Sequence, residues 1–227
     1  MYQLHIANKN YSSWSLRPWV LMKTLGIKFE EIRHSFKPDN FDQFKVFSPS
    51  AKVPVLIDGD VTIWDSLAIT EYLFESHASV WPEQRIARAW ARSAAAEMHS
   101  SFQSLRTCCP MSVGVIAKLK QVTADLEKDI RRLDELFLSG LEEFSGPFLA
   151  GDKFTAVDAF FCPVAFRVRT YNLLLNRKSS DYVEKLLALP SMREWEKRAL
   201  EEQERDPRQE AALDRYANRE EDRRRKS

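Results

Sequence analysis

The first 77 residues alternate between strand-like and helix-like patterns. Strands are predicted where apolar and polar positions alternate or β-branched residues cluster: 2–7, 28–36, 53–59 and 61–64. The last two are joined by Asp58-Gly59, a dipeptide typical of a tight hairpin turn. The pattern therefore predicts two separate strands followed by a β-hairpin.

Helical spacing of apolar residues predicts a helix over 15–26, with Pro18 in its first turn and Gly26 as its stop. Two more predicted helices are a short one over 38–49, capped by Asp39 or Asn40, and an amphipathic one over 65–77 that begins at Asp65 or Ser66. The order β-α-β-α-β-β-α predicts an α/β thioredoxin-like domain over residues 1–77.

Helical patterns dominate after a linker at 78–84, so we expect an all-α helical domain over 85–205. Its helices are predicted over 83–106, about 113–143, 154–171, 179–189 and 191–203. Thr155 and Asp158 have the spacing of an N-cap residue and the acid of a capping box, which assigns them to folding. The tail at 206–227 is dense in both charge signs and is predicted as a solvated helix or a disordered end.

Composition narrows the function classes. The chain has 227 residues, 44% of them apolar, and a net charge of +1, which argues against nucleic acid as the main partner. Its three cysteines are odd in number and contain no C-x-x-C, which disfavours a disulfide framework or a zinc site. We see neither a signal-peptide pattern nor an apolar run of about 20 residues. We expect a cytoplasmic protein with no metal and no membrane partner.

Two motifs suit the backbone and the end groups of a peptide-like ligand. A cis bond at Val53-Pro54 would leave the Val53 N–H and C=O free to pair with such a ligand, whereas a trans proline would simply open the strand. Asp65 and Ser66 stand at a predicted helix N-terminus, where Ser66 would bind a carboxylate and Asp65 an ammonium group. The alternative role for this pair is a plain N-cap.

A third motif, "YSSWSLRPW", places Ser12 and Ser13 between the first strand and the first helix. A hydroxyl there can donate to a thiolate, and one hydrogen bond to a charged group contributes about 1.5–3 kcal/mol. That would lower a thiol pKa by roughly one to two units, enough to ionise it substantially at neutral pH. The alternative is again helix capping.

Together these motifs resemble the cytosolic glutathione transferase superfamily, and the likeness covers about residues 3–200. It rests on "SSWSLRPWV", on "SPSAKVPVLIDGDVTIWDSLAITEYL" and on "GDKFTAVDAFFCPV". The resemblance implies that Ser12, which matches the first serine of the zeta-class S-S-C-S-W-R motif, stabilises the glutathione thiolate, with Ser13 as its substitute. It also implies glutathione-binding roles for Lys52, Val53, Pro54, Asp65 and Ser66.

One departure from the zeta motif is Trp14, which stands where that motif has cysteine and puts isomerase activity in doubt. We expect Trp14 to border the second-substrate site, together with Tyr11, His99, Phe102, Arg106 and Met111. Arg106 could bind an acidic electrophile or form a surface ion pair, and His99 could be an ordinary core or surface residue. Cys108 and Cys109 are interpreted as packing residues.

The sequence thus predicts a homodimeric transferase that uses glutathione as co-substrate and conjugates it to a small electrophile. Two alternatives remain open. One is a glutathione-dependent isomerase, which Trp14 disfavours. The other is a non-catalytic glutathione-binding module, which the presence of all three motifs disfavours. The dimer is implied by the resemblance alone.

Overall fold

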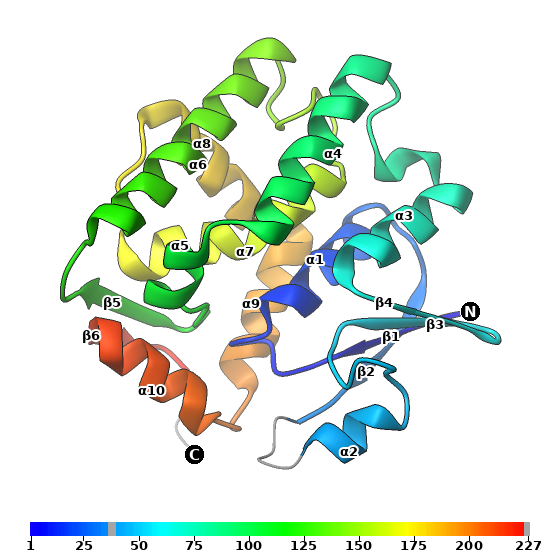
Figure 1. The fold of residues 1–227 in the computed structure, drawn as a ribbon, viewed down its shortest axis with the longest axis horizontal. Coiled ribbons are helices and arrows are strands. Elements are labelled where there is room, and N and C mark those ends of the chain that lie inside the picture. Colours follow the sequence, from blue (N-terminus) through cyan, green and yellow to red (C-terminus); the bar gives the residue numbers. More distant parts are fainter. Residues whose placement is uncertain (36–39, 225–227) are drawn as a thin grey trace.

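The computed structural model describes residues 1–35 and 40–224 and shows two packed domains (Figure 1). The first domain contains a four-stranded sheet in the order β2-β1-β3-β4, with β1 parallel to β2 and antiparallel to β3. Its elements are β1 (Tyr2–Ile6), α1 (Ser13–Thr24), β2 (Phe29–Arg33), α2 (Asn40–Lys45), β3 (Val55–Asp58), β4 (Val61–Trp64) and α3 (Ser66–Ser76). The predicted thioredoxin-like order is confirmed.

Several turns and one proline bond of this domain have the conformation that the local sequence predicted. Gly59 has a φ of 58° in the β3–β4 turn and Gly26 one of 69° just after α1, so both predicted glycine turns are confirmed. The Val53-Pro54 peptide bond is cis, as one of the two sequence interpretations required. The predicted cap at Asp39 or Asn40 falls outside the residues and side chains that the structure describes.

The second domain packs against the first through α1, which contacts α7 and α9. A short 3₁₀ helix, η1 (Ala78–Val80), leads into it. Its helices are α4 (Arg85–Ser100), α5 (Gln103–Cys108), α6 (Ala124–Glu143), α7 (Ala156–Tyr171), α8 (Arg177–Ala188) and α9 (Pro190–Glu201). The predicted helix over 83–106 is broken, because Ser101 is extended and Phe102 adopts a left-handed conformation that buries its ring.

The domain is not purely helical, and the predicted helix over 113–143 is wrong in its first part. Residues Val115–Leu119 form strand β5, which pairs antiparallel with β6 (Ala217–Asp222). Val115 and Ala117 are buried, whereas Ile116 and Lys118 between and after them are more exposed, which is the period of a strand. Helix prediction failed because the partner strand lies a hundred residues further along the chain.

The charged tail is ordered, so the disordered alternative is wrong for the residues described. Helix α10 (Pro207–Tyr216) begins at Asp206, whose side chain accepts from the Arg208 N–H at 2.9 Å, and β6 follows it. Figure 1 shows the α10–β6 segment, in red, lying beside β5 and the N-terminal turn of α1. No helix among the described residues is long and apolar enough to cross a membrane.

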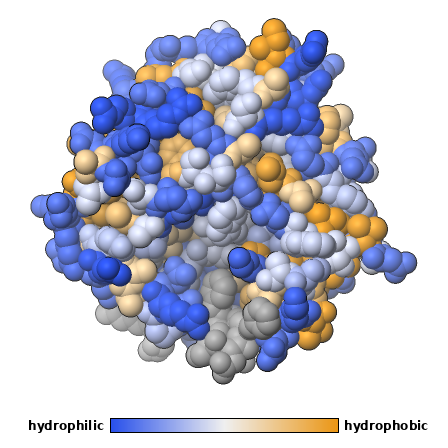
Figure 2. Space-filling model, in the orientation of Figure 1, coloured by the Kyte–Doolittle hydropathy of each residue, from blue (hydrophilic) through white to orange (hydrophobic). Residues whose placement is uncertain are grey.

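Most large apolar side chains are buried in one core that both domains share. Figure 2 shows apolar atoms gathered along the edge of the molecule that carries β3 and β4. There Val61 and Trp64 are each 46% exposed on the edge strand β4.

We predict that Asp158→Ala lowers the free energy of unfolding by about 2–4 kcal/mol, because it leaves three donors unpaired. The buried Asp158 carboxylate accepts from the Leu149 N–H (3.0 Å), the Thr155 N–H (2.9 Å) and the Tyr182 hydroxyl (2.9 Å). Urea unfolding measures the loss, and Asp181→Ala, on the exposed face of α8, is the matched control. Equal stability of both variants would contradict this folding role.

We also predict that His5 contributes a loss of stability as the pH is lowered from about 6.5 to about 4. His5 Nδ1 lies 2.9 Å from His34 Nε2, and burial followed by the charge of His34 lowers the pKa of His5 from 6.5 to about 4. The unfolded chain therefore binds a proton at His5 before the folded chain does, which favours unfolding in that range. Unfolding titrations should show that the stability of His5→Gln, relative to that of the wild type, rises as the pH is lowered through this range.

Candidate functional site

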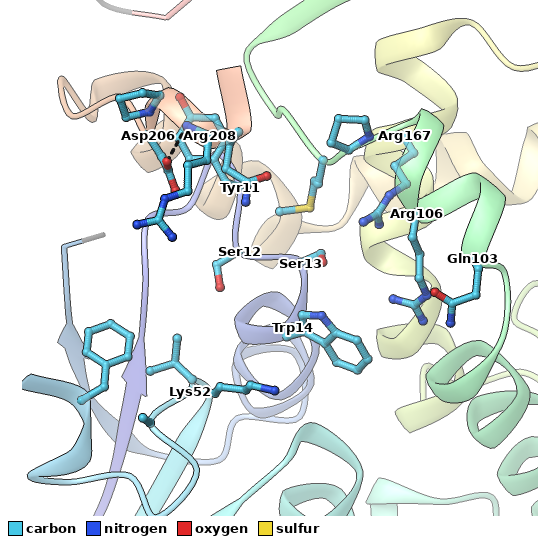
Figure 3. A pocket seen from close by; sticks show the side chains of 17 residues that line it. Tyr11, Ser12, Ser13, Trp14, Lys52, Gln103, Arg106, Arg167, Asp206 and Arg208 are labelled. Atoms are coloured by element: carbon cyan, nitrogen blue, oxygen red, sulfur yellow. Dashed lines mark hydrogen bonds between the residues drawn. The ribbon is translucent and has the colours of Figure 1, made fainter. Parts of the chain in front are cut away.

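A cavity of about 830 Å³ lies where the two domains meet at the start of α1 (Figure 3). Five parts of the chain contribute to it: the turn before α1, the α2–β3 region, α5 with its following loop, α7, and the start of α10. The lining residues are Tyr11, Ser12, Ser13, Trp14, Phe44, Ala51, Lys52, Val53, Gln103, Arg106, Pro110, Met111, Arg167, Asp206, Pro207, Arg208 and Gln209.

Ser12 and Ser13 both line this cavity but point in different directions. Figure 3 shows the Ser12 hydroxyl on the side of Lys52 and the Ser13 hydroxyl on the side of Arg106 and Arg167. Ser12 is the N-cap residue of α1, yet its side chain forms no capping bond. Its Oγ donates instead to Ser15 Oγ at 2.7 Å, and Ser15 Oγ accepts from the Ala7 N–H at 3.3 Å. The capping alternative therefore does not describe Ser12.

The loop before β3 presents backbone groups to the same cavity. Ser48 Oγ donates to the Lys52 carbonyl at 2.6 Å and accepts from the Lys52 N–H at 3.1 Å, which fixes the loop at that point. Within the part of the chain that the structure describes, the N–H and C=O of Val53 form no hydrogen bond. An extended peptide could pair with these two groups as an added strand.

Asp65 and Ser66 stand at the start of α3, but neither lines the cavity. Asp65 Oδ1 accepts from the Leu67 N–H at 2.8 Å, so it serves as an N-cap, and Oδ2 lies 3.5 Å from His99 Nε2. Ser66 is fully buried, and its Oγ accepts from Arg17 Nη1 at 3.4 Å.

Trp14 forms the centre of a cationic cluster. The guanidinium carbons of Arg17 and Arg106 lie 4.2 Å and 4.8 Å from its ring centroid. Arg106 is held by the carbonyl groups of Met98 and of Ser101, the latter accepting from Nε at 2.9 Å. Arg17 was not singled out from the sequence, although it belongs to the same "SSWSLRPW" motif.

Arg167 completes the cluster from α7 and donates through Nε to the Cys109 carbonyl at 2.9 Å. Burial, followed by the charges of its neighbours, lowers the pKa of Arg17, and burial followed by the charge of Arg106 lowers that of Arg167 to about 10. Among the described residues none of these three guanidinium groups forms an ion pair, and the buried Arg17 Nε has no partner. Arg167 is one of two arginines, with Arg169, in a mostly apolar helix, and that pattern was the signal that could have revealed it.

The other predicted second-substrate residues are placed differently. Met111 lines the cavity, whereas His99 and Phe102 do not. The His99 ring stands edge-on to Trp14 at 5.2 Å, and Phe102 is 3% exposed within the core. Tyr11 lines the cavity, but its hydroxyl donates to Glu210 Oε1 at 2.6 Å and is therefore directed at α10.

The start of α10 lines the cavity, although the charge pattern of residues 206–227 predicted only a solvated helix or a disordered end. One wall of the cavity is formed by residues 206–209. Gln103 of α5 lines the cavity as well. No local pattern distinguishes these residues from a solvated charged helix. Cys109 is fully buried, in agreement with a packing role, and no group of three metal-ligating side chains occurs among the described residues.

Comparisons with known proteins agree with this architecture. Residues 11–76 match the family model "Glutathione S-transferase, N-terminal domain" and residues 84–198 match "Glutathione S-transferase, C-terminal domain". The chain is 29% identical to glutathione S-transferase Z1 of Arabidopsis thaliana, over 68% of this chain and 74% of that protein. It is 28% identical to a probable maleylacetoacetate isomerase of Caenorhabditis elegans, over 72% of this chain and 77% of that protein.

Solved structures show the same fold. A glutathione transferase homologue from Burkholderia, with bound glutathione, superposes with a TM-score of 0.66 at 24% identity and covers 87% of this chain and 97% of that one. The tau-class enzyme of Mangifera indica gives a TM-score of 0.68 at 19% identity, with coverages of 94% and 96%. Through both its sheet-containing and its helical domain, the chain belongs to the glutathione S-transferase family.

Proposed function

We propose that this glutathione transferase ionises the thiol of glutathione with Ser12 and transfers the sulfur to a small electrophile that carries an anionic group. One observation carries the proposal: Ser12 and Val53 line the same inter-domain cavity, the Ser12 hydroxyl lies on the side of Lys52 (Figure 3), and the backbone groups of Val53 form no hydrogen bond within the described chain. A glutathione whose cysteinyl backbone pairs with Val53 brings its sulfur toward the start of α1. Lys52, on the same wall, suits the glycyl carboxylate.

Ser12 and Ser15 can act as a pair of hydroxyl groups. Ser12 Oγ now donates to Ser15 Oγ at 2.7 Å. When a thiolate is present, the Ser12 hydrogen can turn to the sulfur and the Ser15 hydroxyl can donate to Ser12 in return, because hydroxyl hydrogens rotate freely. A donor that itself accepts a hydrogen bond is strengthened by it, so the pair stabilises the thiolate better than one serine alone.

The transfer then follows ordinary thiolate chemistry. The thiol releases its proton to solvent, and the sulfur lone pair forms a bond to an electron-poor carbon of the second substrate. A leaving group departs with its bonding electrons or, in an addition, solvent protonates the resulting carbanion. Ser12 favours the ionised sulfur, while the positive side of the cavity stabilises charge that develops on the electrophile.

The arginine cluster supports an anionic second substrate. Arg106 and Arg167 line the cavity on the side of Ser13 (Figure 3), and the Arg17 guanidinium group adds positive charge 4.2 Å from the centroid of the Trp14 ring. Burying the guanidinium groups of Arg17 and Arg167 without an ion pair is costly unless a ligand supplies the countercharge. A carboxylate on a planar or apolar electrophile would meet the guanidinium groups while its body packs on Trp14 and Met111.

A glutathione-dependent isomerase is the second candidate, favoured by the similarity to proteins named maleylacetoacetate isomerases. There the thiolate would add to a double bond, allow rotation and leave again. Trp14, in place of the zeta cysteine, counts against it. Conjugation consumes free glutathione and isomerisation does not, so measuring the concentration of free thiol during turnover separates them.

The homodimer and the cytoplasmic location stay predictions.

We predict that Ser12→Ala raises the pKa of bound glutathione by roughly one to two units, because it removes a hydrogen bond to the thiolate. Ultraviolet titration of the thiolate at saturating glutathione measures the change. Ser13→Ala is the matched comparison, since that hydroxyl faces the arginine side. A rise in Ser13→Ala alone would transfer the role to Ser13, and no rise in either would contradict thiolate activation by these serines.

We further predict that Arg106→Met raises KM about tenfold for a chlorodinitrobenzoate but changes KM less than about twofold for the neutral chlorodinitrobenzene, since only the benzoate loses a charge partner. Arg106→Lys keeps the charge and should retain part of the preference. Steady-state kinetics with both electrophiles provide the measurement. Equal loss for the two electrophiles would show that Arg106 acts on stability or on glutathione and not on the substrate anion.

A further inference from the structure

The turn that precedes Ser12 forms hydrogen bonds with the C-terminal part of the chain. Residues 8–11 are all buried despite their polar side chains. Asn8 Nδ2 donates to the Glu204 carbonyl (3.2 Å), and Asn10 Nδ2 donates to the Ala199 carbonyl (2.6 Å). Lys9 is held through its backbone: its N–H donates to Glu202 Oε2 (2.8 Å), and its carbonyl accepts from Trp195 Nε1 (2.9 Å). The position of Ser12 therefore depends on residues far from it in the sequence.

Tyr11, directly before Ser12, extends this dependence to the end of the described chain. Its hydroxyl donates to Glu210 Oε1 at 2.6 Å and accepts from Arg224 Nη1 at 2.9 Å. Arg224 also donates to both carboxylate oxygens of Glu210, at 2.6 and 3.0 Å. One guanidinium group thus joins the turn of Ser12 to α10.

The surroundings of Arg224 accommodate a buried guanidinium group. Its side chain is 1% exposed and also binds Asp222 through Nε (2.8 Å) and Nη2 (2.5 Å). A Cβ at Gly114 would lie 2.2 Å from Arg224 Cγ, so the guanidinium stem passes through space that a glycine leaves open. Burial opposes ionisation of Glu210, but its bonds with Arg224 and Tyr11 lower its pKa to about 2, which keeps the pair charged.

The same segment forms part of the cavity. Residues 206–209 line it at the beginning of α10, next to Tyr11 (Figure 3). The match to the family model of the C-terminal domain ends at residue 198, so this wall lies outside both matched domains. Glu210 follows the wall directly and is the residue that Arg224 holds.

We propose that Arg224 is a positioning residue of the active site, which holds Tyr11 against α10 and thereby fixes both the Ser12 turn and the cavity wall at 206–209. This inference rests on the proposed transferase function, because its effect is on thiolate stabilisation by Ser12. Arg224 touches neither substrate. It acts through Tyr11 on the direction of the Ser12 hydroxyl, and through Glu210 on the space left for the second substrate.

The test compares Arg224→Met with Arg223→Met, the neighbouring arginine that pairs with Glu196 at 3.3 Å and makes no contact with Tyr11. Thiolate titration at saturating glutathione and steady-state kinetics are run on the full chain, with a thermal melt as the folding control. We expect Arg224→Met to raise the pKa of bound glutathione by about one unit and to lower kcat about tenfold. KM for glutathione should change less than about threefold, and Arg223→Met should match the wild type.

Tyr11→Phe is a second variant that removes one oxygen and leaves the Arg224 bonds to Glu210 and Asp222 intact. It should reproduce the rise in thiolate pKa, and it decides the matter if Arg224→Met fails to fold. A lowered thiolate pKa in the wild type that neither Arg224→Met nor Tyr11→Phe changes would overturn the positioning role and leave the transferase proposal standing. A wild-type protein that does not lower the thiol pKa would overturn both.

Discussion

The packing of α1 between the two domains is the constraint on which the rest of the structure depends. Nine of its 12 residues are buried, so the helix contacts protein on nearly all sides. Trp19 meets Trp195 of α9 edge-to-face at 5.0 Å between ring centroids, and its Nε1 donates to Glu31 of β2 at 2.6 Å. Sheet, α1 and α9 are thereby locked together, and the start of α1 is fixed at the domain boundary.

This arrangement explains why the position of Ser12 can be precise although it lies at the end of a turn. A loop residue is normally mobile, because its backbone polar groups face water. Here the side chains of Asn8, Asn10 and Tyr11 are buried and hydrogen-bonded to the second domain or to the C-terminal segment, and the Lys9 N–H donates to Glu202. Buried, hydrogen-bonded residues therefore fix the position of Ser12, while Ser12 itself lines the cavity.

Electrostatics divides the cavity into two unequal halves. The half near Lys52 and Val53 offers the Lys52 ammonium group and the backbone groups of Val53, which suit a peptide-like ligand. The half near Trp14 offers Arg106 and Arg167, with Arg17 behind the indole ring. The indole ring of Trp14 provides a surface on which the guanidinium groups of Arg17 and Arg106 stack.

The sequence alone determined what depends on neighbours in the chain. The β-α-β-α-β-β-α order follows from local periodicity, and the glycine turns at Gly26 and Gly59 follow from backbone conformations that few other residues adopt. Compact motifs also named Ser12, Lys52 and Val53, and all three line the inter-domain cavity. Tertiary structure alone decided the pairing of β5 with β6, the burial of Arg17 and Arg224, and the cavity wall at 206–209. In each of these cases the stabilising partner is distant in the chain, and a charged residue looks the same in a local pattern whether water or a buried carboxylate surrounds it.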